Sequence, residues 1–272
     1  MAVVFDKQFV LSLPDDAFPA RNSRIGHRTW TRGLMASDVT ASSAQDDFPA
    51  DAPLRPDTFE RWRPTSTSAT WEVDLGSAQP VSYVGIAAHT LGESNASVLV
   101  EYSQDGGETW QQFSARAPGD DRAIMFLANE VAARNWRLTF ESQTIFEVGV
   151  IYLGPVLVMQ RPIYGGHTPV LLSRTTTIRT SRSRSGQFLG QDFRRRGYQT
   201  SASFSNLEPA WLRREFEPFI EDARIYPYFF AWRPTTYPRE VAYVWTADDI
   251  APQNSGTREL MDVSWDMVGF DE

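Results

Sequence analysis

Short apolar runs separated by polar, glycine-rich and proline-rich segments recur along the whole chain. β-branched and aromatic residues dominate these runs, and Gly, Pro, Asn and Asp punctuate them, which is the pattern of strands joined by turns. Their spacing predicts an antiparallel sandwich or barrel in the first half, with long loops over residues 35–68. The strands predicted there are 69–76, 81–89, 96–103, 123–128, 135–142 and 146–154.

The second half repeats the strand pattern and adds a helix. Leu207, Trp211, Leu212, Phe216, Phe219 and Ile220 form an apolar stripe at helical spacing, which predicts a helix over residues 206–223. Ser205 and Glu208 have the spacing of a capping box at its start. This half is therefore predicted to be a β-sandwich or barrel with one packed helix. Its predicted strands are 197–204, 225–232, 240–247 and 259–269.

Together these patterns give a mainly β chain of two domains. The predicted boundaries are 16–155 and 156–272, and residues 1–15 could join the second domain.

Hydrophobic residues make up 42% of the 272 positions, enough for a substantial core. The absence of cysteine excludes disulfides and thiolate zinc sites. The N-terminal residues lack the features of a signal peptide, and no apolar run is long enough to cross a membrane, so we expect a protein made in the cytoplasm.

Charge is distributed unevenly between the halves. Residues 1–160 carry a net charge of −8 and residues 161–272 a net charge of 0, although residues 161–200 hold eight arginines and one acid. The Arg/Ser-rich segment 174–198 reads as a long mobile hairpin or loop. It could be a solvated loop, it could pair with acidic surfaces of neighbouring subunits, or it could face DNA in a tube. Specific nucleic-acid binding is not expected, because arginine alternates there with serine rather than with aromatic residues.

The stretch SQDGGETW, Ser103 to Trp110, predicts a hairpin and carries a first resemblance. It resembles the Asp-box of sialidases and other β-propellers, but no second copy recurs along the chain. The order of ATWEVDLG, PVSYVGI, VLVEYSQDGGETW and ARNWRLTF over residues 35–155 instead resembles the discoidin family, also called F5/8 type C or galactose-binding-like domains. The resemblance implies a jelly-roll β-sandwich. The side chains expected in its core are Trp71, Leu75, Val84, Ile86, Val98, Val100, Trp110, Trp136 and Leu138.

Discoidin-like domains that bind sugars do so through loops at one end of the sandwich, and the resemblance therefore implies a glycan site. The candidates combine aromatic rings with cationic or imidazole donors, which suit the apolar face and the hydroxyl groups of a sugar. For Trp62 a place in the core is the competing interpretation. The six candidates are His27, Arg28, Trp30, Trp62, Arg63 and His89.

Many members of the family also hold a structural calcium ion in the same segment. Asp57 and Thr58 could match its ligands here, with Glu147 one residue out of register. The segment lacks the family's Asp-Gly-Asp/Asn sequence, and no other cofactor is expected.

Residues 150–272 resemble tail proteins of tailed phages that build the hub or distal end of the tail tube. The cues are the capped helix, the YPYFFAW and VAYVW strands, and VIYLGPVLVMQRPIYGG followed by an Arg/Ser segment. The resemblance implies a structural virion protein at the tail tip or baseplate. Such a protein would form a ring with copies of itself, contact other tail proteins and display the discoidin-like domain towards host glycans. The residues expected at the ring interface are Arg179, Arg182, Arg184, Arg194, Arg195 and Arg196.

A search for catalytic motifs argues against an enzyme. The three histidines lack metal-ligand spacing, and the chain has no nucleophile elbow, P-loop or dinucleotide-binding fingerprint. Paired acids such as Asp120–Asp121 fall in polar loops, where solvation is the simpler interpretation. Two alternatives remain open: a non-catalytic carbohydrate-binding module fused to a β accessory domain and, third, a glycan hydrolase suggested only by the Asp-box likeness.

Overall fold

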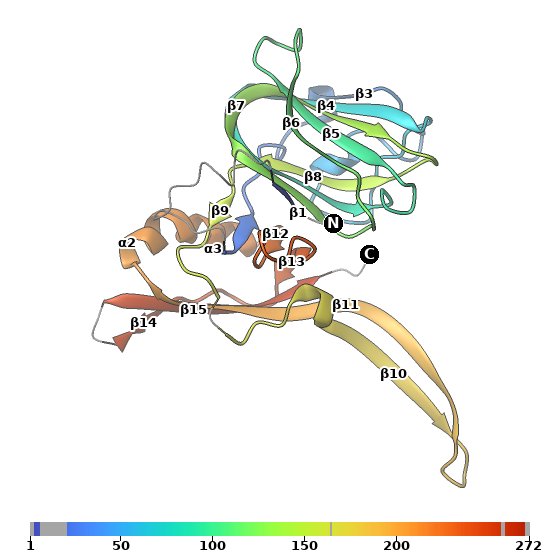
Figure 1. The fold of residues 1–272 in the computed structure, drawn as a ribbon, viewed down its shortest axis with the longest axis vertical. Helices are drawn as coiled ribbons and strands as arrows, with labels where there is room; N and C mark the ends of the chain where they lie inside the picture. Colours follow the sequence, from blue (N-terminus) through green and yellow to red (C-terminus); the bar gives the residue numbers. More distant parts are fainter. Residues whose placement is uncertain (1–2, 6–20, 164, 257–258, 270–272) are drawn as a thin grey trace.

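In a computed structural model, the chain forms two β units joined side by side, with a long two-stranded arm that projects from one of them (Figure 1). The structure describes residues 3–5, 21–163, 165–256 and 259–269. The predicted mainly β fold is confirmed. No helix of the described residues is long and apolar enough to cross a lipid bilayer.

The first unit is a sandwich whose described strands form a seven-stranded sheet folded over on itself. Its order is β3-β4-β7-β5-β6, with β8 on β4 and β1 parallel to β7. The strands and short helices are β1 (Val3–Phe5), η1 (Ala36–Asp38), β3 (Val39–Ala41), η2 (Ala52–Leu54), β4 (Ser68–His89), β5 (Ser97–Ser103), β6 (Gln111–Arg116), β7 (Ile124–Glu141) and β8 (Val148–Gly154).

Two long strands make the sandwich by bending from one layer into the other. β4 pairs with the end of β7 over Ser68–Asp74 and with its beginning over Tyr83–Ile86. Bulges between Asp74 and Gln79 and between Val81 and Tyr83 separate the two stretches, which is how strands turn the corners of such sandwiches. Each of these strands is predicted from the sequence as two, because the polar break at each corner resembles a turn.

Alternating side chains of these strands fill the core of the first unit. Three tryptophans, Trp62, Trp71 and Trp136, are fully buried there. Eight of the nine predicted core residues are confirmed as buried. The exception is Trp110, which lies half-buried on the surface, where the guanidinium of Arg137 sits 4.2 Å from its ring centre.

The second unit is a sheet in the order β10-β11-β15-β13-β12-β2-β9, with β14 on β15. A helical segment covers one face (Figure 1). Its Phe216 and Phe219 rings pack on Trp265. The elements are β2 (Arg24–Gly26), β9 (Leu157–Val158), η3 (Val170–Leu172), β10 (Arg174–Arg182), β11 (Phe188–Leu207), α2 (Pro209–Trp211), η4 (Leu212–Phe216), α3 (Glu217–Ala223), β12 (Tyr228–Ala231), β13 (Val241–Thr246), β14 (Gln253–Ser255) and β15 (Leu260–Gly269).

The helix begins later than its sequence predicts. β11 continues to Leu207, Asn206 adopts a left-handed φ of 61°, and Pro209 opens the helix. The prediction of a capping box formed by Ser205 and Glu208 is wrong. Glu208 is itself the N-cap residue, and its side chain makes no capping hydrogen bond. The predicted apolar stripe is confirmed in the second core, with Ile220 at its edge. A π-helical turn, η4, precedes Pro218, a residue that cannot donate to the helix ladder.

The structure differs from the predicted domain boundaries at the N-terminal end. β2 lies within the second sheet, between β12 and β9, although the sequence places it ahead of the first unit. β1 pairs with the first unit rather than the second, and the remainder of 1–15 lies outside the described residues. The second unit is therefore discontinuous in sequence, and the part of the first unit from η1 to β8 is inserted between its strands β2 and β9.

A third apolar cluster joins the two units. Tyr83, Tyr152 and Val150 of the first unit pack against Phe229, Val241 and Tyr243 of the second. The hydroxyls of Tyr152 and Tyr243 lie 3.1 Å apart, and Tyr243 also donates to the carbonyl of Pro56 over 2.7 Å. Because these hydroxyls find partners while their rings are buried, the junction is packed like a protein interior.

Candidate functional site

The loops at one end of the first sandwich form a polar cavity of about 350 Å³. It lies where the segments before β4, after β4 and before β8 approach one another. The side chains around it are mostly hydrogen-bonding groups, with Ile145 as an exposed apolar member. The lining residues are Gln45, Arg63, Thr90, Glu93, Ser94, Thr144, Ile145 and Glu147.

Backbone pairing fixes the positions of the charged groups in this cavity. Trp62 forms an isolated β-bridge with Val148, so Arg61 and Arg63 lie on either side of Glu147. Arg63 is ion-paired with Glu147, and Nη1 of Arg61 lies 3.4 Å from the other carboxylate oxygen. The guanidinium of Arg63 also sits 3.9 Å from the ring centre of Phe48.

Thr90 holds the opposite wall of the cavity. Its hydroxyl accepts a hydrogen bond from the Glu147 backbone N–H over 2.9 Å, and its own N–H donates to the Glu147 carbonyl over 3.1 Å. Ser94 accepts at its carbonyl from the N–H of Gln143. The loops are therefore tied to one another through the backbone, which leaves side-chain donors and acceptors to face the cavity.

The predicted calcium ligands do not fit an ion here. Oδ1 of Asp57 caps the backbone N–H groups of Phe59 and Glu60, at 3.2 and 3.0 Å. Both oxygens of Glu147 are engaged by guanidinium groups, which leaves no oxygen free for a cation. The structure does not join Asp57, Thr58 and Glu147 in one cluster, and it shows no group of three or more potential metal ligands among the residues it describes.

Only Arg63 of the six predicted glycan residues lines this cavity. Trp62 lies beneath it, fully buried, with its ring edge-on to Phe140 and Phe146, so it has no face open to a ligand. The ring of Trp30 packs against the first core, and its Nε1 donates to the Pro80 carbonyl over 2.8 Å. These two tryptophans therefore contribute to core packing and do not form a platform for a sugar ring.

His89 is buried beneath the neighbouring loop. Nδ1 accepts from the N–H of Leu91 over 3.2 Å, so Nε2 carries the proton and donates to the Arg122 carbonyl at 3.0 Å. Burial lowers the pKa of His89 to about 4. This histidine is a neutral structural bridge between two loops.

His27 belongs to the junction of the two units. Its Nδ1 lies 2.8 Å from Asp222, which Arg32 also contacts at 3.2 Å. Burial lowers the pKa of His27, and Asp222 offsets part of that effect. Burial by itself would raise the pKa of Asp222, but hydrogen bonds from His27 and Arg32 outweigh it and lower that pKa. Arg28 is exposed beside a small cavity of about 220 Å³ on the same side.

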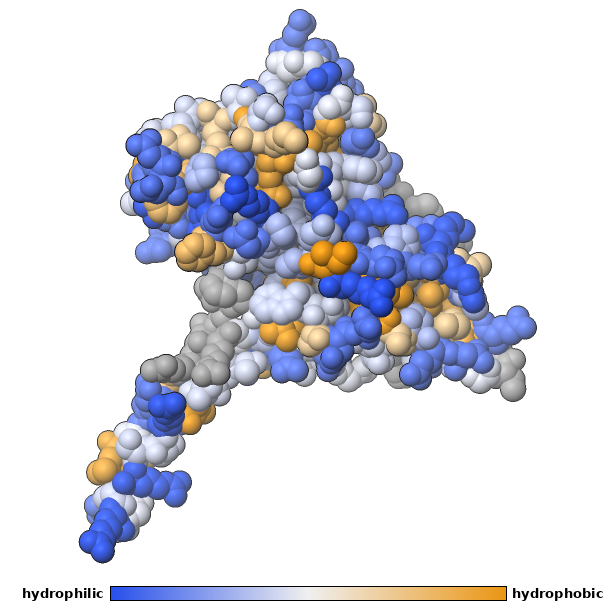
Figure 2. Space-filling view, turned by 180° about the vertical axis from the view of Figure 1, so that it is seen from behind, coloured by the Kyte–Doolittle hydropathy of each residue, from blue (hydrophilic) through white to orange (hydrophobic). Residues whose placement is uncertain are grey.

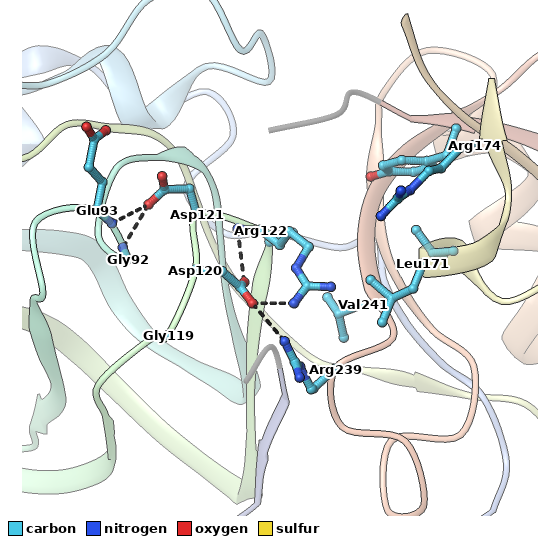
Figure 3. Close-up of a pocket in the computed structure, with 13 residues that line it drawn as sticks. Gly92, Glu93, Gly119, Asp120, Asp121, Arg122, Leu171, Arg174, Arg239 and Val241 are labelled. Atoms are coloured by element: carbon cyan, nitrogen blue, oxygen red, sulfur yellow. Dashed lines mark hydrogen bonds and ion pairs between the residues drawn. The ribbon is translucent and has the colours of Figure 1, made fainter. Parts of the chain in front are cut away.

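A second and larger cavity, of about 610 Å³, lies between the two units (Figure 3). Figure 3 shows Glu93 and Asp121 on the wall from the first unit and Leu171 and Arg174 on the wall from the second. Asp120 lies between them, ion-paired with Arg122 and 3.6 Å from Nη2 of Arg239. Asp120 therefore links Arg122 of the first unit with Arg239 of the second across this cavity.

The predicted interface arginines lie on the arm formed by β10 and β11. Arg179, Arg182 and Arg184 are exposed on it. Residues 194–196 lie in β11 of the same arm.

Asp105 explains the Asp-box likeness as turn chemistry. Its carboxylate accepts from the Ser103 hydroxyl over 2.6 Å and from the Thr109 N–H over 2.9 Å, and these bonds depress its pKa. Gly106 and Gly107 take left-handed conformations that the turn requires. The motif closes the hairpin of β5 and β6.

Comparison with known families identifies the first unit. Residues 38–149 match the F5/8 type C domain family. This part of the chain is an F5/8 type C domain. The match covers the sandwich and most of the loops that line the 350 Å³ cavity. No curated protein matches the chain.

Several solved structures are similar to the F5/8 type C half. Chitosan-binding module 1 of a chitosanase/glucanase from Paenibacillus sp. IK-5 is 18% identical, covers 47% of this chain and 100% of its own, and has a TM-score of 0.42. CpGH89CBM32-5 from Clostridium perfringens, in complex with GalNAc-β-1,3-galactose, is 12% identical, with 51% and 99% covered and a TM-score of 0.39. A GH29 fucosidase from Ruminococcus gnavus is 13% identical over 47% of this chain and 26% of its own, with a TM-score of 0.40.

Sequence reasoning found Arg63 but missed most of the cavity. Gln45, Thr90, Ser94 and Thr144 are ordinary polar loop residues with no spacing that marks them. One signal was present: in an antiparallel sandwich, alternate connections emerge at the same end. The loops before β4, after β4 and before β8 could have been grouped on that ground.

Proposed function

We propose that this chain is a non-catalytic glycan-binding protein whose F5/8 type C domain takes a sugar in the cavity around Arg63. The observation that carries the proposal is the position of this cavity, which is formed by converging loops at one end of that domain. Its volume of about 350 Å³ lies in the usual range of small-ligand sites.

The side chains around the cavity suit sugar hydroxyls. Arg63 has five N–H donors and uses only some of them on Glu147, while the side chains of Gln45 and Thr90 can both donate and accept. Ile145, 40% exposed, offers an apolar contact for the face of a sugar ring. Because the loops are held by backbone bonds, the site is formed before a ligand arrives, which reduces the entropic cost of binding.

Titration calorimetry with a panel of oligosaccharides tests this function. Chitosan oligosaccharides and galactose- or fucose-terminated glycans, the sugars named for the similar structures, are sensible first probes. Arg63→Ala should weaken binding by about ten-fold or more, the loss expected for a charged donor to a bound ligand. Arg134→Ala is the matched control, because Arg134 is an exposed arginine whose partner is Asp74, outside the cavity. No binding across the panel, or equal losses in both variants, would refute the site.

The proposal includes the absence of catalysis. Glycoside hydrolysis uses a pair of carboxylates, one of which donates a proton. Glu147 meets two guanidinium groups, so neither of its oxygens faces the cavity as a free proton donor. Incubation with a broad set of aryl glycosides should release no aglycone, and measurable turnover that Glu147→Gln abolishes would contradict this assignment.

A second candidate function is structural: a distal tail or baseplate component of a tailed phage, assembled as a ring with the F5/8 type C domain at its periphery. The observation that favours it is the arm, which extends away from the body (Figure 1). Electron microscopy should then show rings of the purified protein, and immunogold labelling should place it at the tail tip of particles. Particles that form normally and lack the protein would rule this function out.

A further inference from the structure

The arm, defined as residues 174–197, is a two-stranded ribbon with both edges free among the described residues. β10 pairs with β11 from Arg174↔Tyr198 out to Arg182↔Phe188, whereas β11 meets β15 only from Tyr198 onwards. No described side chain of β10 is buried. An isolated two-stranded ribbon is marginally stable in water, so this arm gains most from a surface that covers it.

The two faces of the arm differ in chemistry. Ile178 lies directly opposite Phe193, and Arg182 lies opposite Phe188, so these four side chains share what we call the docking face. Ile178, Phe188 and Phe193 are 52%, 66% and 64% exposed. Figure 2 shows apolar residues spaced along the arm between hydrophilic ones. Arg179 points to the opposite face, where its cross-strand partner is Asp192.

Charge identifies the kind of surface that the arm fits. Residues 174–196 hold seven arginines and one aspartate, which leaves a net charge of −14 for the rest of a chain whose total is −8. The arm points away from its own body (Figure 1) and, with nine residues in β10, reaches roughly 30 Å. The complementary acidic surface is therefore the body of a second copy of this chain.

The second sheet offers a matching surface on the side away from its helix. Along β15, Val263, Trp265 and Met267 point into the core, so Asp262 and Asp266 point outwards. Trp245, opposite Val268, is on the same outward side and is 40% exposed. We call these three residues the acidic seat. Asp266 is exposed, whereas Asp262 is half-buried and its Oδ1 accepts a hydrogen bond from the Asn206 N–H over 2.8 Å.

We propose that the arm of one copy docks through its docking face on the acidic seat of a second copy. Arg182 pairs with the exposed Asp266, and Ile178, Phe188 and Phe193 cover the apolar ring of Trp245. Since arm and seat are different surfaces, each copy gives one contact and receives another, and the contact is heterologous. Such contacts close into a ring when the rotation allows it. This inference rests on assembly, the second candidate function, and is independent of glycan binding.

Sedimentation equilibrium of the full chain without glycan tests the docking. The wild-type protein should self-associate, and more strongly at low salt than at high salt. Arg182→Glu should weaken association by about ten-fold or more. Arg179→Glu makes the same charge change on the opposite face and should cost less than about threefold. A wild-type protein that stays monomeric at every concentration and salt, or equal effects of the two substitutions, would overturn the proposal.

A charge exchange tests the seat. Asp266→Arg by itself should weaken association as Arg182→Glu does, and the two together in one chain should restore it, because the arm of each copy then meets a reversed seat. Failure of the double variant to recover would place the arm on another surface. Arg213→Glu, on the exposed side of the helix, is the control for net charge and should leave association unchanged. Self-association that persists in a protein absent from particles would end the phage assignment while leaving the docking intact.

Discussion

The ring of Phe229 in the second unit lies directly over Gly85 in the first. A Cβ on Gly85 would come within 2.5 Å of Phe229 Cε2, closer than two carbon atoms tolerate. Gly26 has the same relation to Tyr83, also at 2.5 Å. Glycine at these two positions is thus a condition for the close approach of the two units.

Gly85→Ala should destabilise the protein. The methyl group would push Phe229 out of the interdomain cluster, and overpacking of this kind costs about 1–3 kcal/mol. Urea denaturation followed by tryptophan fluorescence measures the loss. Gly119→Ala is the control, because nothing lies within 4 Å of a Cβ at that position. An unchanged midpoint for Gly85→Ala would mean that the two units are not packed together as described.

Tyr243→Phe should weaken the same junction through hydrogen bonding alone. The change removes the bond to the Pro56 carbonyl and the contact with the Tyr152 hydroxyl while keeping the ring, so we expect a cost of about 1–2 kcal/mol. Tyr237→Phe, at a 44% exposed position, should be nearly neutral.

Calorimetric unfolding of the wild-type protein should show one transition, because the two units share this junction. Two well-separated transitions in the wild type would contradict a shared core.

The buried His89 should make stability fall with acid. Its pKa is about 4 in the folded protein, below an unfolded value of about 6.5, so the unfolded chain binds the proton first. The contribution of neutral His89 to the free energy of unfolding is complete above about pH 6.5. It is lost as the pH falls towards 4, which lowers that free energy by up to about 3 kcal/mol. Comparing the unfolding free energies of the wild type and His89→Gln across this range isolates the effect. If the difference between the two proteins does not change with pH, His89 is not buried in its neutral form.

Removal of calcium should leave the protein unaffected. Arg61 and Arg63 neutralise Glu147, and Asp57 caps its own loop, so these residues offer no calcium site whose binding energy would be lost. Thermal unfolding in excess calcium and in excess chelator should give the same Tm. A Tm that rises with calcium concentration would show that the arginine pair gives way to an ion.

Local chemistry made much of the fold predictable. The hairpin around Asp105 was predictable because its residues contact their own neighbours in sequence. The apolar runs of β5, β8 and β13 predicted those strands directly. The helix stripe was equally clear, but its start was not. Asn206 in a left-handed conformation and Pro209 at the first turn determine that start together with Gln160, whose side chain accepts from the Glu208 N–H.

What escaped prediction depends on partners distant in the chain. Nothing in Arg24–Gly26 indicates that it pairs with Phe229–Ala231, because three residues carry almost no periodicity. The same limit applies to the candidate site, where Gln45, Thr90 and Thr144 meet only after the sandwich closes. Trp62 and His89 were predicted to bind glycan because of their residue types. In the structure Trp62 is buried in the core, and His89 is buried where it bridges two loops.

The position of β2 has a consequence for synthesis on the ribosome. Arg24–Gly26 leaves the exit tunnel before any residue of its two neighbours, Leu157–Val158 and Phe229–Ala231, has been translated. The F5/8 type C domain can fold before β2 has any partner, because β12 is translated only in the last quarter of the chain. Folding of the F5/8 type C domain can therefore be complete before the second sheet begins to form.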